Sequence, residues 1–236
     1  MKVAVISDIH GNSDALKQML EHAKLENVEK LLVLGDLVGY YYHPDLVLNL
    51  LDKWDYVLIR GNHEVMLKEV MEGILDINVL NKKYGSGHQF ALDKLSKEQL
   101  NQITLAPDQK EIVITGTKIL LCHGSNWDPN CYLYPDTKVE ILNKSGQVKA
   151  DFVFIGHSHY SFVHENQNNM LINVGSVGQS RKHGGVAEWG LLNSKTQEFR
   201  LMKTKYNVKR ILVETKKTDP DNLYLQTILK RNNEEI

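Results

Sequence analysis

The sequence predicts an α/β fold in which two mixed sheets pack face to face with helices on the outside, an αββα sandwich. Two observations lead to this prediction. Short apolar runs alternate with helical stripes over the first 60 residues, which favours parallel strands and right-handed crossovers. After residue 110, short strand-like runs follow one another, separated by Gly, Asn and Ser. We expect one domain over residues 1–236, with 205–236 as a C-terminal addition of a strand and a helix.

The first half of the chain supplies the alternating elements. Apolar runs rich in Val, Leu and Ile predict buried strands at 2–7, 30–35 and 56–60. Helices are expected at 13–25, with Asn12 or Ser13 as the N-cap, and at 45–52. Residues 64–105 are helical in pattern. Within them, Ser96 and Gln99 resemble a capping box for a helix that ends before Pro107.

The second half reads mostly as strands. The runs EIVIT and KILLCH flank Gly116 and predict a hairpin, and DFVFIG predicts another buried strand at 151–156. The run KRILVE (209–214) is interpreted as a strand, and a helix is expected from about residue 221. Further short strands are predicted at 161–164, 169–174, 186–193 and 196–202.

Composition narrows the class of protein. The 236 residues include 42% hydrophobic and 24% charged residues, which is typical of a globular chain. The net charge of −1 argues against nucleic-acid binding. Two cysteines, Cys122 and Cys131, cannot form a disulfide framework. The sequence shows neither a signal peptide nor an apolar run of about 20 residues, so we expect a cytoplasmic protein without a membrane span.

Polar residues gather where the predicted strands end. Any one of them alone is more often a helix cap or an ordinary histidine than part of a site. Five strand ends that all deliver Asp, Asn or His are different, because burying such groups together without a cation is costly. Oxygen and nitrogen ligands without thiolate suit Mn, Fe, Zn or Ni. The residues are Asp8, His10, Asp36, Asn62, His63, His123, His157 and His159.

The ordered blocks that carry these residues resemble the calcineurin-like metallophosphoesterase superfamily. The blocks are DIH (8–10), GDLVG (35–39), GNHE (61–64), HG (123–124) and GHSH (156–159). The segment NVGSVGQSR (173–181) also resembles small bacterial and archaeal members. The resemblance implies the two-sheet αββα sandwich, in agreement with the fold expected from the strand and helix patterns.

The resemblance also implies two divalent metal ions, with Mn favoured and Fe, Zn or Ni as alternatives. Asp36 would bridge them. The first site would be completed by Asp8, His10 and His159, and the second by Asn62, His123 and His157. A hydroxide shared by the metals would attack phosphorus. His63 would be the catalytic residue that protonates the leaving alkoxide or contacts the phosphoryl oxygens. Glu64 is expected to orient a neighbour.

The second block departs from that of the protein Ser/Thr phosphatases. In the block that resembles those enzymes, Gly39 and Tyr40 stand at the positions of an Asp and a phosphate-binding Arg. The absence of this Arg argues against a phosphoprotein substrate. The run from Tyr40 to His43 could stack a base or sugar, or could simply pack as a loop. Arg181 is a candidate substrate contact, with solvated loop charge as the alternative. Arg60 is expected to be structural.

The leading hypothesis is therefore a phosphodiesterase that acts on a small or nucleotide-like phosphate ester. The alternatives are a phosphomonoesterase, including a protein phosphatase, and a non-catalytic scaffold that binds partners. A nuclease is disfavoured by the charge balance. The apolar C-terminal addition could serve a homo-oligomer or pack within a monomer.

Overall fold

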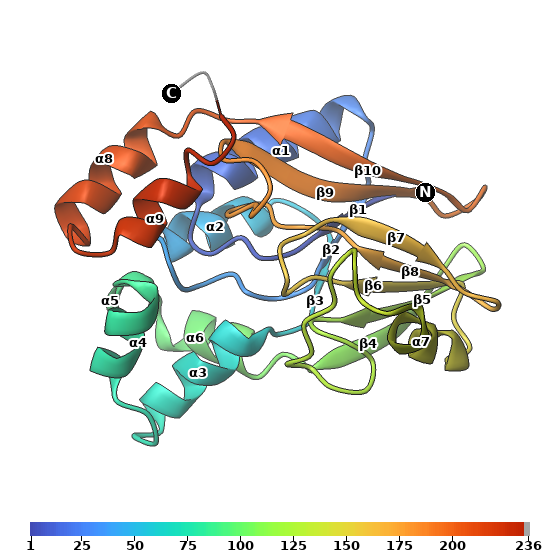
Figure 1. Cartoon of the computed structure of the whole chain (residues 1–236), viewed down its shortest axis with the longest axis horizontal. Coiled ribbons are helices and arrows are strands. Elements are labelled where there is room, and N and C mark those ends of the chain that lie inside the picture. Colours follow the sequence, from blue (N-terminus) through green and yellow to red (C-terminus); the bar gives the residue numbers. More distant parts are fainter. Residues whose placement is uncertain (234–236) are drawn as a thin grey trace.

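Two five-stranded sheets face each other, with helices on the outside (Figure 1), as the sequence predicts. The computed structural model describes residues 1–233; the last three residues of the expected C-terminal addition, 234–236, lie outside the described part. Strand order is β10-β9-β1-β2-β3 in the first sheet and β4-β5-β6-β8-β7 in the second. Each sheet is mixed, because parallel central strands are flanked by antiparallel ones.

The parallel strands set the direction in which the loops leave each sheet. In the first sheet β1 pairs in parallel with β2, and β2 with β3. In the second, β5, β6 and β8 are parallel neighbours. The strands are β1 (Lys2–Ile6), β2 (Lys30–Val33), β3 (Tyr56–Leu58), β4 (Gln109–Ile114), β5 (Thr117–Cys122), β6 (Phe152–Ile155), β7 (Phe162–Glu165), β8 (Met170–Asn173), β9 (Val186–Asn193) and β10 (Glu198–Lys205).

Helices cover the sandwich and close one of its ends. In Figure 1, α3 to α6 and the pair α8 and α9 lie at the same end of the molecule, while α1 lies against β9 and β10. The helices are α1 (Ser13–Leu25), α2 (Pro44–Leu51), α3 (Asn62–Met71), α4 (Ile77–Tyr84), α5 (Gly87–Lys94), α6 (Lys97–Thr104), α7 (Val139–Leu142), α8 (Lys209–Thr218) and α9 (Leu223–Ile228), with a 3₁₀ turn at Asn143–Gln147.

The expected caps are present. Asn12 Oδ1 accepts a hydrogen bond from the backbone N–H of Ala15 and caps α1. Ser96 and Gln99 form the reciprocal capping box of α6. Both interactions satisfy backbone N–H groups that the first turn of a helix leaves without a partner.

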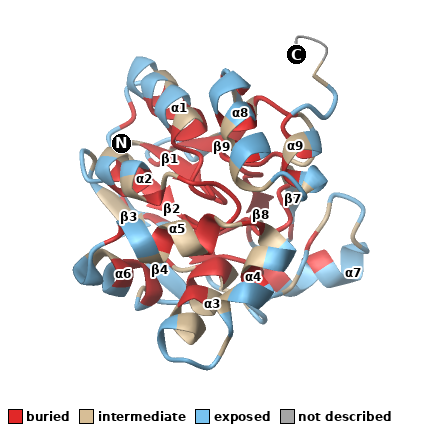
Figure 2. Cartoon of the chain, turned by 90° about the vertical axis from the view of Figure 1, so that its left-hand side faces the viewer, coloured by how far each residue is buried: buried red, intermediate tan, exposed pale blue. Residues whose placement is uncertain are grey.

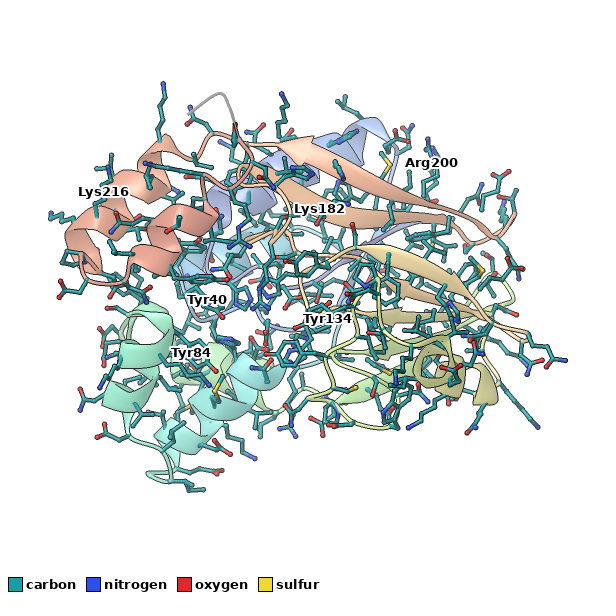
Figure 3. The ribbon with its side chains drawn as sticks, in the orientation of Figure 1. Tyr40, Tyr84, Tyr134, Lys182, Arg200 and Lys216 are labelled. Atoms are coloured by element: carbon teal, nitrogen blue, oxygen red, sulfur yellow. The ribbon has the colours of Figure 1, made fainter. Side chains whose placement is uncertain are left out.

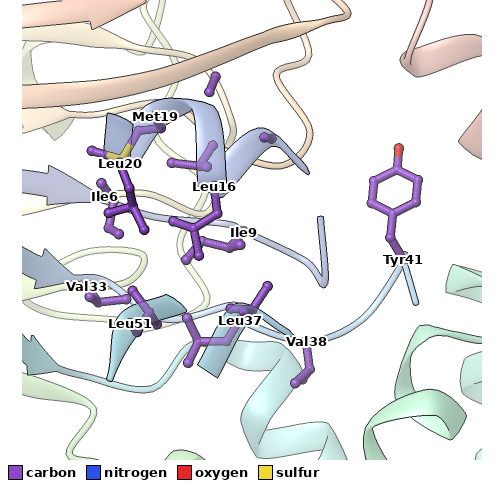
Figure 4. Packing of buried hydrophobic residues seen from close by; sticks show 14 of the residues in the cluster. Ile6, Ile9, Leu16, Met19, Leu20, Val33, Leu37, Val38, Tyr41 and Leu51 are labelled. Atoms are coloured by element: carbon purple, nitrogen blue, oxygen red, sulfur yellow. The ribbon is translucent and has the colours of Figure 1, made fainter. Parts of the chain in front are cut away.

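Two apolar cores lie on opposite faces of the first sheet. Val3 and Val5 of β1 point between the sheets and pack in one cluster with Phe154. Ile6 belongs to the other cluster, which fills the space under α1, where Figure 4 shows it close to Leu20. Because both faces of β1 are covered, its sequence reads as a continuous apolar run. Figure 2 shows the same layering, with buried strands and exposed outer helix faces.

The predicted strand at 209–214 is wrong, because this segment begins α8. Ile211, Leu212 and Thr215 are buried, while Val213 is 68% exposed. A strand would place residues 211 and 213 on the same face, whereas a helix groups 211, 212 and 215. The β-branched residues favoured a strand, and packing of the apolar stripe against the body of the protein decides for a helix. The helix expected from about residue 221 is present as α9.

No helix within residues 1–233 combines the length and the apolar character that crossing a membrane would require.

Candidate metal centre

The seven expected metal ligands come together at one edge of the sandwich. Each lies just after the carboxyl end of a strand, or at the start of the helix that follows β3. The His and Asp side chains form three overlapping groups whose ligand atoms lie within 4.8 Å of one another. These groups are Asp8–His10–His159, His10–Asp36–His63 and Asp36–His123–His157.

In the first group, which is Asp8, His10 and His159, hydrogen-bond acceptor atoms face one another. His10 Nδ1 donates a hydrogen bond to the carbonyl oxygen of Val38 (2.9 Å), and His159 Nδ1 donates to that of Gln179 (2.7 Å). In the neutral form of either ring, a proton on Nδ1 leaves Nε2 with a lone pair. These two Nε2 atoms lie 3.1 Å apart, and His159 Nε2 lies 3.2 Å from Asp8 Oδ1. Asp8 Oδ1 is buried and has no hydrogen-bond partner among the described residues. A cation is the group that such a set of acceptors lacks.

The ligands of the second group are anchored to the backbone in a similar way. His123 Nδ1 donates to the carbonyl oxygen of Leu34 (2.7 Å), which leaves Nε2 to face the site. This Nε2 lies 3.1 Å from Asn62 Oδ1, 3.1 Å from His157 Nδ1 and 3.3 Å from Asp36 Oδ2. The structure thus adds Asn62 to the groups of His and Asp, where its side-chain oxygen is a further acceptor.

Asp36 lies between the two groups. Its Oδ2 is 3.3 Å from His123 Nε2 and 3.8 Å from His10 Nε2. Its Oδ1 accepts a hydrogen bond from the backbone N–H of His63 (2.9 Å), which fixes the carboxylate plane. A carboxylate held in this way can offer an oxygen to both groups.

The charges inside the site favour a cation. Burial alone would raise the pKa of Asp36, but His123 and His63 lower this pKa well below its ordinary value. Burial lowers the pKa of His10 and of His157 to about 4 each, so both rings are neutral at pH 7. Burial also opposes charge on His123, yet the adjacent Asp36 raises its pKa to about 10. The positive charge of protonated His123 offsets the negative charge of Asp36. A bound metal ion would supply this positive charge instead.

Five of the side chains sit on left-handed backbone. The φ angles are 55° at Asp8, 52° at His10, 55° at Asp36, 65° at His157 and 61° at His159. Asp and His tolerate this conformation better than most residues. The turns after β1 and β6 bring pairs of side chains two residues apart into the site.

Glu64 holds the backbone around the site, as expected. Its carboxylate accepts hydrogen bonds from the backbone N–H groups of Asp36 (2.8 Å), Leu37 (2.7 Å) and Gly61 (2.8 Å). Arg60 is likewise structural, because its guanidinium binds Asp108 and the carbonyl oxygen of Thr104.

The tyrosines that follow the second block, Tyr40 to Tyr42, differ in their surroundings. One borders the candidate metal centre, and the other two pack as part of a loop. Tyr40 is 6% exposed, and its ring packs against His10 (centroids 4.6 Å apart) and His63 (5.0 Å). Tyr41 and Tyr42 are fully buried and pack as part of the protein interior. Only Tyr40 therefore borders the candidate metal centre, where Figure 3 shows it opposite Tyr84.

Arg181 also borders the centre. The side chain is half-buried and interacts electrostatically with Tyr40, Tyr132 and Asp8. Its Nε is buried and has no hydrogen-bond partner in the described part of the chain. Arg181 is therefore partly withdrawn from solvent beside the tyrosine rings, and its contact with substrate stays a prediction.

His88 and Tyr132 are among the residues at the site that belong to no motif in the sequence. His88 is fully buried, and its Nε2 lies 3.2 Å from His63 Nδ1. Tyr132 stacks on His157 with ring centroids 3.9 Å apart. His88 lies in a helix that the sequence pattern predicts only as part of 64–105, and Tyr132 lies in a loop. No signal in the sequence alone distinguishes either from an ordinary aromatic residue.

Comparison with known proteins identifies the class that this fold and site define. The calcineurin-like phosphoesterase superfamily domain matches residues 1–196, and the chain belongs to this family. Its members hydrolyse phosphate esters, and the grouped His and Asp side chains fit divalent metal binding.

The relatives found include proteins from archaea and bacteria. An uncharacterized protein of Methanocaldococcus jannaschii is 30% identical over 228 residues, covering 88% of this chain and 89% of that one. The crystal structure of a hypothetical protein from Pyrococcus horikoshii shares the fold with a TM-score of 0.81 at 21% identity, covering 98% of both chains. A metallophosphoesterase from Sphaerobacter thermophilus gives 0.77 at 22% identity, covering 97% of this chain and 98% of that one.

Proposed function

We propose that this protein is a cytoplasmic phosphodiesterase with a dinuclear metal centre that hydrolyses a small or nucleotide-like phosphate ester. The observation that carries the proposal is the pair of acceptor groups that share Asp36. Asp8, His10 and His159 would hold one cation, and Asn62, His123 and His157 the other. Mn is the favoured metal, and the same ligand set also suits Fe, Zn or Ni.

The chain's own side chains have distinct roles in this proposal. Divalent cations at the two groups would supply an activated water and neutralise phosphate oxygens. His63 Nε2 lies 4.0 Å from Asp36 Oδ2, so the ring stands at the border of the ligand groups. From there it can donate a hydrogen bond to a phosphoryl or leaving-group oxygen. The left-handed turns and the hydrogen bonds to Val38, Leu34 and Gln179 hold the ligands in place.

A tyrosine-lined cavity supports a substrate with a planar group. Tyr132 stacks on His157, and Tyr134 stacks on Tyr132 with centroids 6.1 Å apart. Tyr134 in turn lines a cavity of about 530 Å³. Aromatic faces bind bases by stacking. Lys182, which lines the same cavity, suits a second anionic group of the substrate. The other lining residues are Pro135, Asp136, Tyr160 and Ser161.

A phosphomonoesterase is the second candidate, and Arg181 favours it. A half-buried guanidinium that interacts electrostatically with Asp8 would suit the terminal oxygens of a monoester dianion. A binding scaffold is disfavoured, because a chain without catalysis has no need to keep all seven ligand side chains in place.

The test begins with metal-free protein. Chelator-treated protein is reloaded with Mn, Fe, Zn or Ni, and bound metal is counted by mass spectrometry. Activity is then compared on bis-p-nitrophenyl phosphate and p-nitrophenyl phosphate. We expect about two ions per chain, activity only after reloading, and faster cleavage of the diester. Replacing Asp36 with Ala should lower metal content at both groups, while Asp8→Ala should leave the second group loaded. Full activity after chelation would overturn the proposal.

A further inference from the structure

A second histidine pair lies behind the candidate catalytic residue. His63 is in the first turn of α3, and His88 is in the first turn of α5. Their rings are parallel within 6°, with centroids 4.9 Å apart, and His88 Nε2 lies 3.2 Å from His63 Nδ1. His88 is not in any of the three ligand groups. It is fully buried, and its other nitrogen, Nδ1, has no hydrogen-bond partner among the described residues.

The unpartnered nitrogen decides where the protons of this pair lie. If His63 Nδ1–H donated to His88, the proton of His88 would be on its Nδ1 and would form a buried N–H group without an acceptor. If His88 Nε2–H donates instead, only a lone pair is left without a partner. Buried N–H groups without acceptors are rarer in proteins than buried acceptors without donors. The second arrangement is therefore favoured.

We infer that His88 is a positioning residue that keeps His63 in the tautomer with its proton on Nε2. This inference rests on the proposed function, in which His63 faces the phosphate ester. With Nδ1 accepting from His88, the Nε2–H of His63 is directed to the side of the ring where Asp36 lies. His63 is then a fixed hydrogen-bond donor to a phosphoryl oxygen. No proton leaves the ring in this role.

Two glycines give the pair its space. A Cβ on Gly39 would lie 2.1 Å from His63 Nδ1, the atom that contacts His88. A Cβ on Gly87, the neighbour of His88, would lie 2.5 Å from the backbone of Gly39 and Tyr40. The loop after β2 thus packs directly against His63 and against the residue that precedes His88, and it confines the His63 ring to its present position.

The kinetic test uses two variants of His88. His88→Phe keeps an aromatic ring but removes the N–H donor, and His88→Gln restores a donor. We expect kcat on bis-p-nitrophenyl phosphate to fall about 10-fold to 100-fold in His88→Phe, as it does when other orienting partners are lost. KM and metal content should stay within about 2-fold, and His88→Gln should recover most of kcat. In a His63→Ala background, His88→Phe should have no further effect. Equal losses in both backgrounds, or in both His88 variants, would contradict the inference.

A second readout does not depend on activity. Nitrogen-15 NMR of the Zn-loaded protein reports which ring nitrogen carries the proton, and His63→Ala identifies the His63 signals. We expect a protonated Nε2 on His63 in the wild type and a mixture of tautomers in His88→Phe. A wild-type His63 protonated on Nδ1 would overturn the inference. If the wild type hydrolysed no ester, the proposed function would fail, and the NMR result alone would decide the role of His88.

Discussion

The side chain of Glu64 accepts a hydrogen bond of 2.8 Å from the backbone N–H of Asp36. The same carboxylate also binds the N–H groups of Leu37 and Gly61, so it joins the loop after β2 to the loop before α3. Burial and the nearby Asp36 raise the pKa of Glu64 to about 7, against the opposing effect of these N–H groups. Above this pH the carboxylate is an acceptor only.

Replacing Glu64 with Gln should therefore destabilise the protein. One oxygen becomes an NH₂ group that faces backbone donors, and a buried donor without an acceptor costs about 1–3 kcal/mol. We expect the metal-free protein to lose about 2–4 kcal/mol, measured by urea unfolding at pH 8. Glu72→Gln at the exposed end of α3 is the matched control and should change stability by less than about 0.5 kcal/mol. Similar values for the two variants would show that Glu64 does not hold the loops.

Gly39→Ala should disturb His63 directly. Gly39 has a φ of +82°, and a Cβ there would meet His63 Nδ1 at 2.1 Å. Gly73 has a similar φ of +73°, but a Cβ there would have no neighbour within 4 Å. Gly73→Ala should therefore cost about 1 kcal/mol from backbone strain alone, while Gly39→Ala should cost more and also lower kcat at least 10-fold.

Thermal unfolding and diester hydrolysis measure these two effects. If Gly39→Ala and Gly73→Ala behaved alike in both measurements, the contact between Gly39 and His63 would have no consequence.

Tyr134→Leu should weaken binding of a nucleoside ester. Stacking of a base on an aromatic side chain contributes about 1–3 kcal/mol, so KM should rise about 5-fold to 100-fold for the p-nitrophenyl ester of thymidine 5′-monophosphate. Methyl p-nitrophenyl phosphate has the same leaving group and no nucleoside, so its KM should change little. An equal change for both esters would argue that the cavity beside Tyr134 does not bind the nucleoside.

His88 should make the metal-free protein less stable in acid. Burial lowers the pKa of His88 from its ordinary value of 6.5 to about 4. Between pH 6.5 and 4 the unfolded chain binds a proton on His88 that the folded protein does not bind. The free energy of unfolding therefore falls as the pH decreases, by up to about 1.4 kcal/mol per pH unit for this group.

In His88→Phe this contribution disappears, although His10 and His157 still act in the same direction. We expect a shallower decline of the urea-unfolding free energy between pH 6.5 and 4 than in the wild type. A slope identical to that of the wild type would mean that His88 is not held neutral by burial.

The candidate ligands at the strand ends could be predicted from the sequence because two local signals coincide there. An apolar run buried on both faces stands out in the chain, and Asp8, Asp36 or His157 follows at once. The direction of parallel strands then brings these residues to one edge. The matching family blocks supplied the assignment of each residue to a metal.

His88, Tyr132 and the position of Arg181 could not be found in this way. Their partners at the site are far away in sequence, and only the packing of α5, the loop after β5 and the loop before β9 brings them near. The helix α8 was missed for a related reason. Its apolar residues suit a strand locally, and the choice depends on a surface contributed by the rest of the fold.

The left-handed turns at the candidate ligands have a consequence for how a metal would bind. A residue other than glycine held in this conformation costs of the order of 1–3 kcal/mol, and five of the ligand residues have positive φ. Hydrogen bonds from the ligand rings to the backbone help to offset that cost. An arriving ion would thus meet ligands already in position, and ion capture would proceed without ordering of the chain.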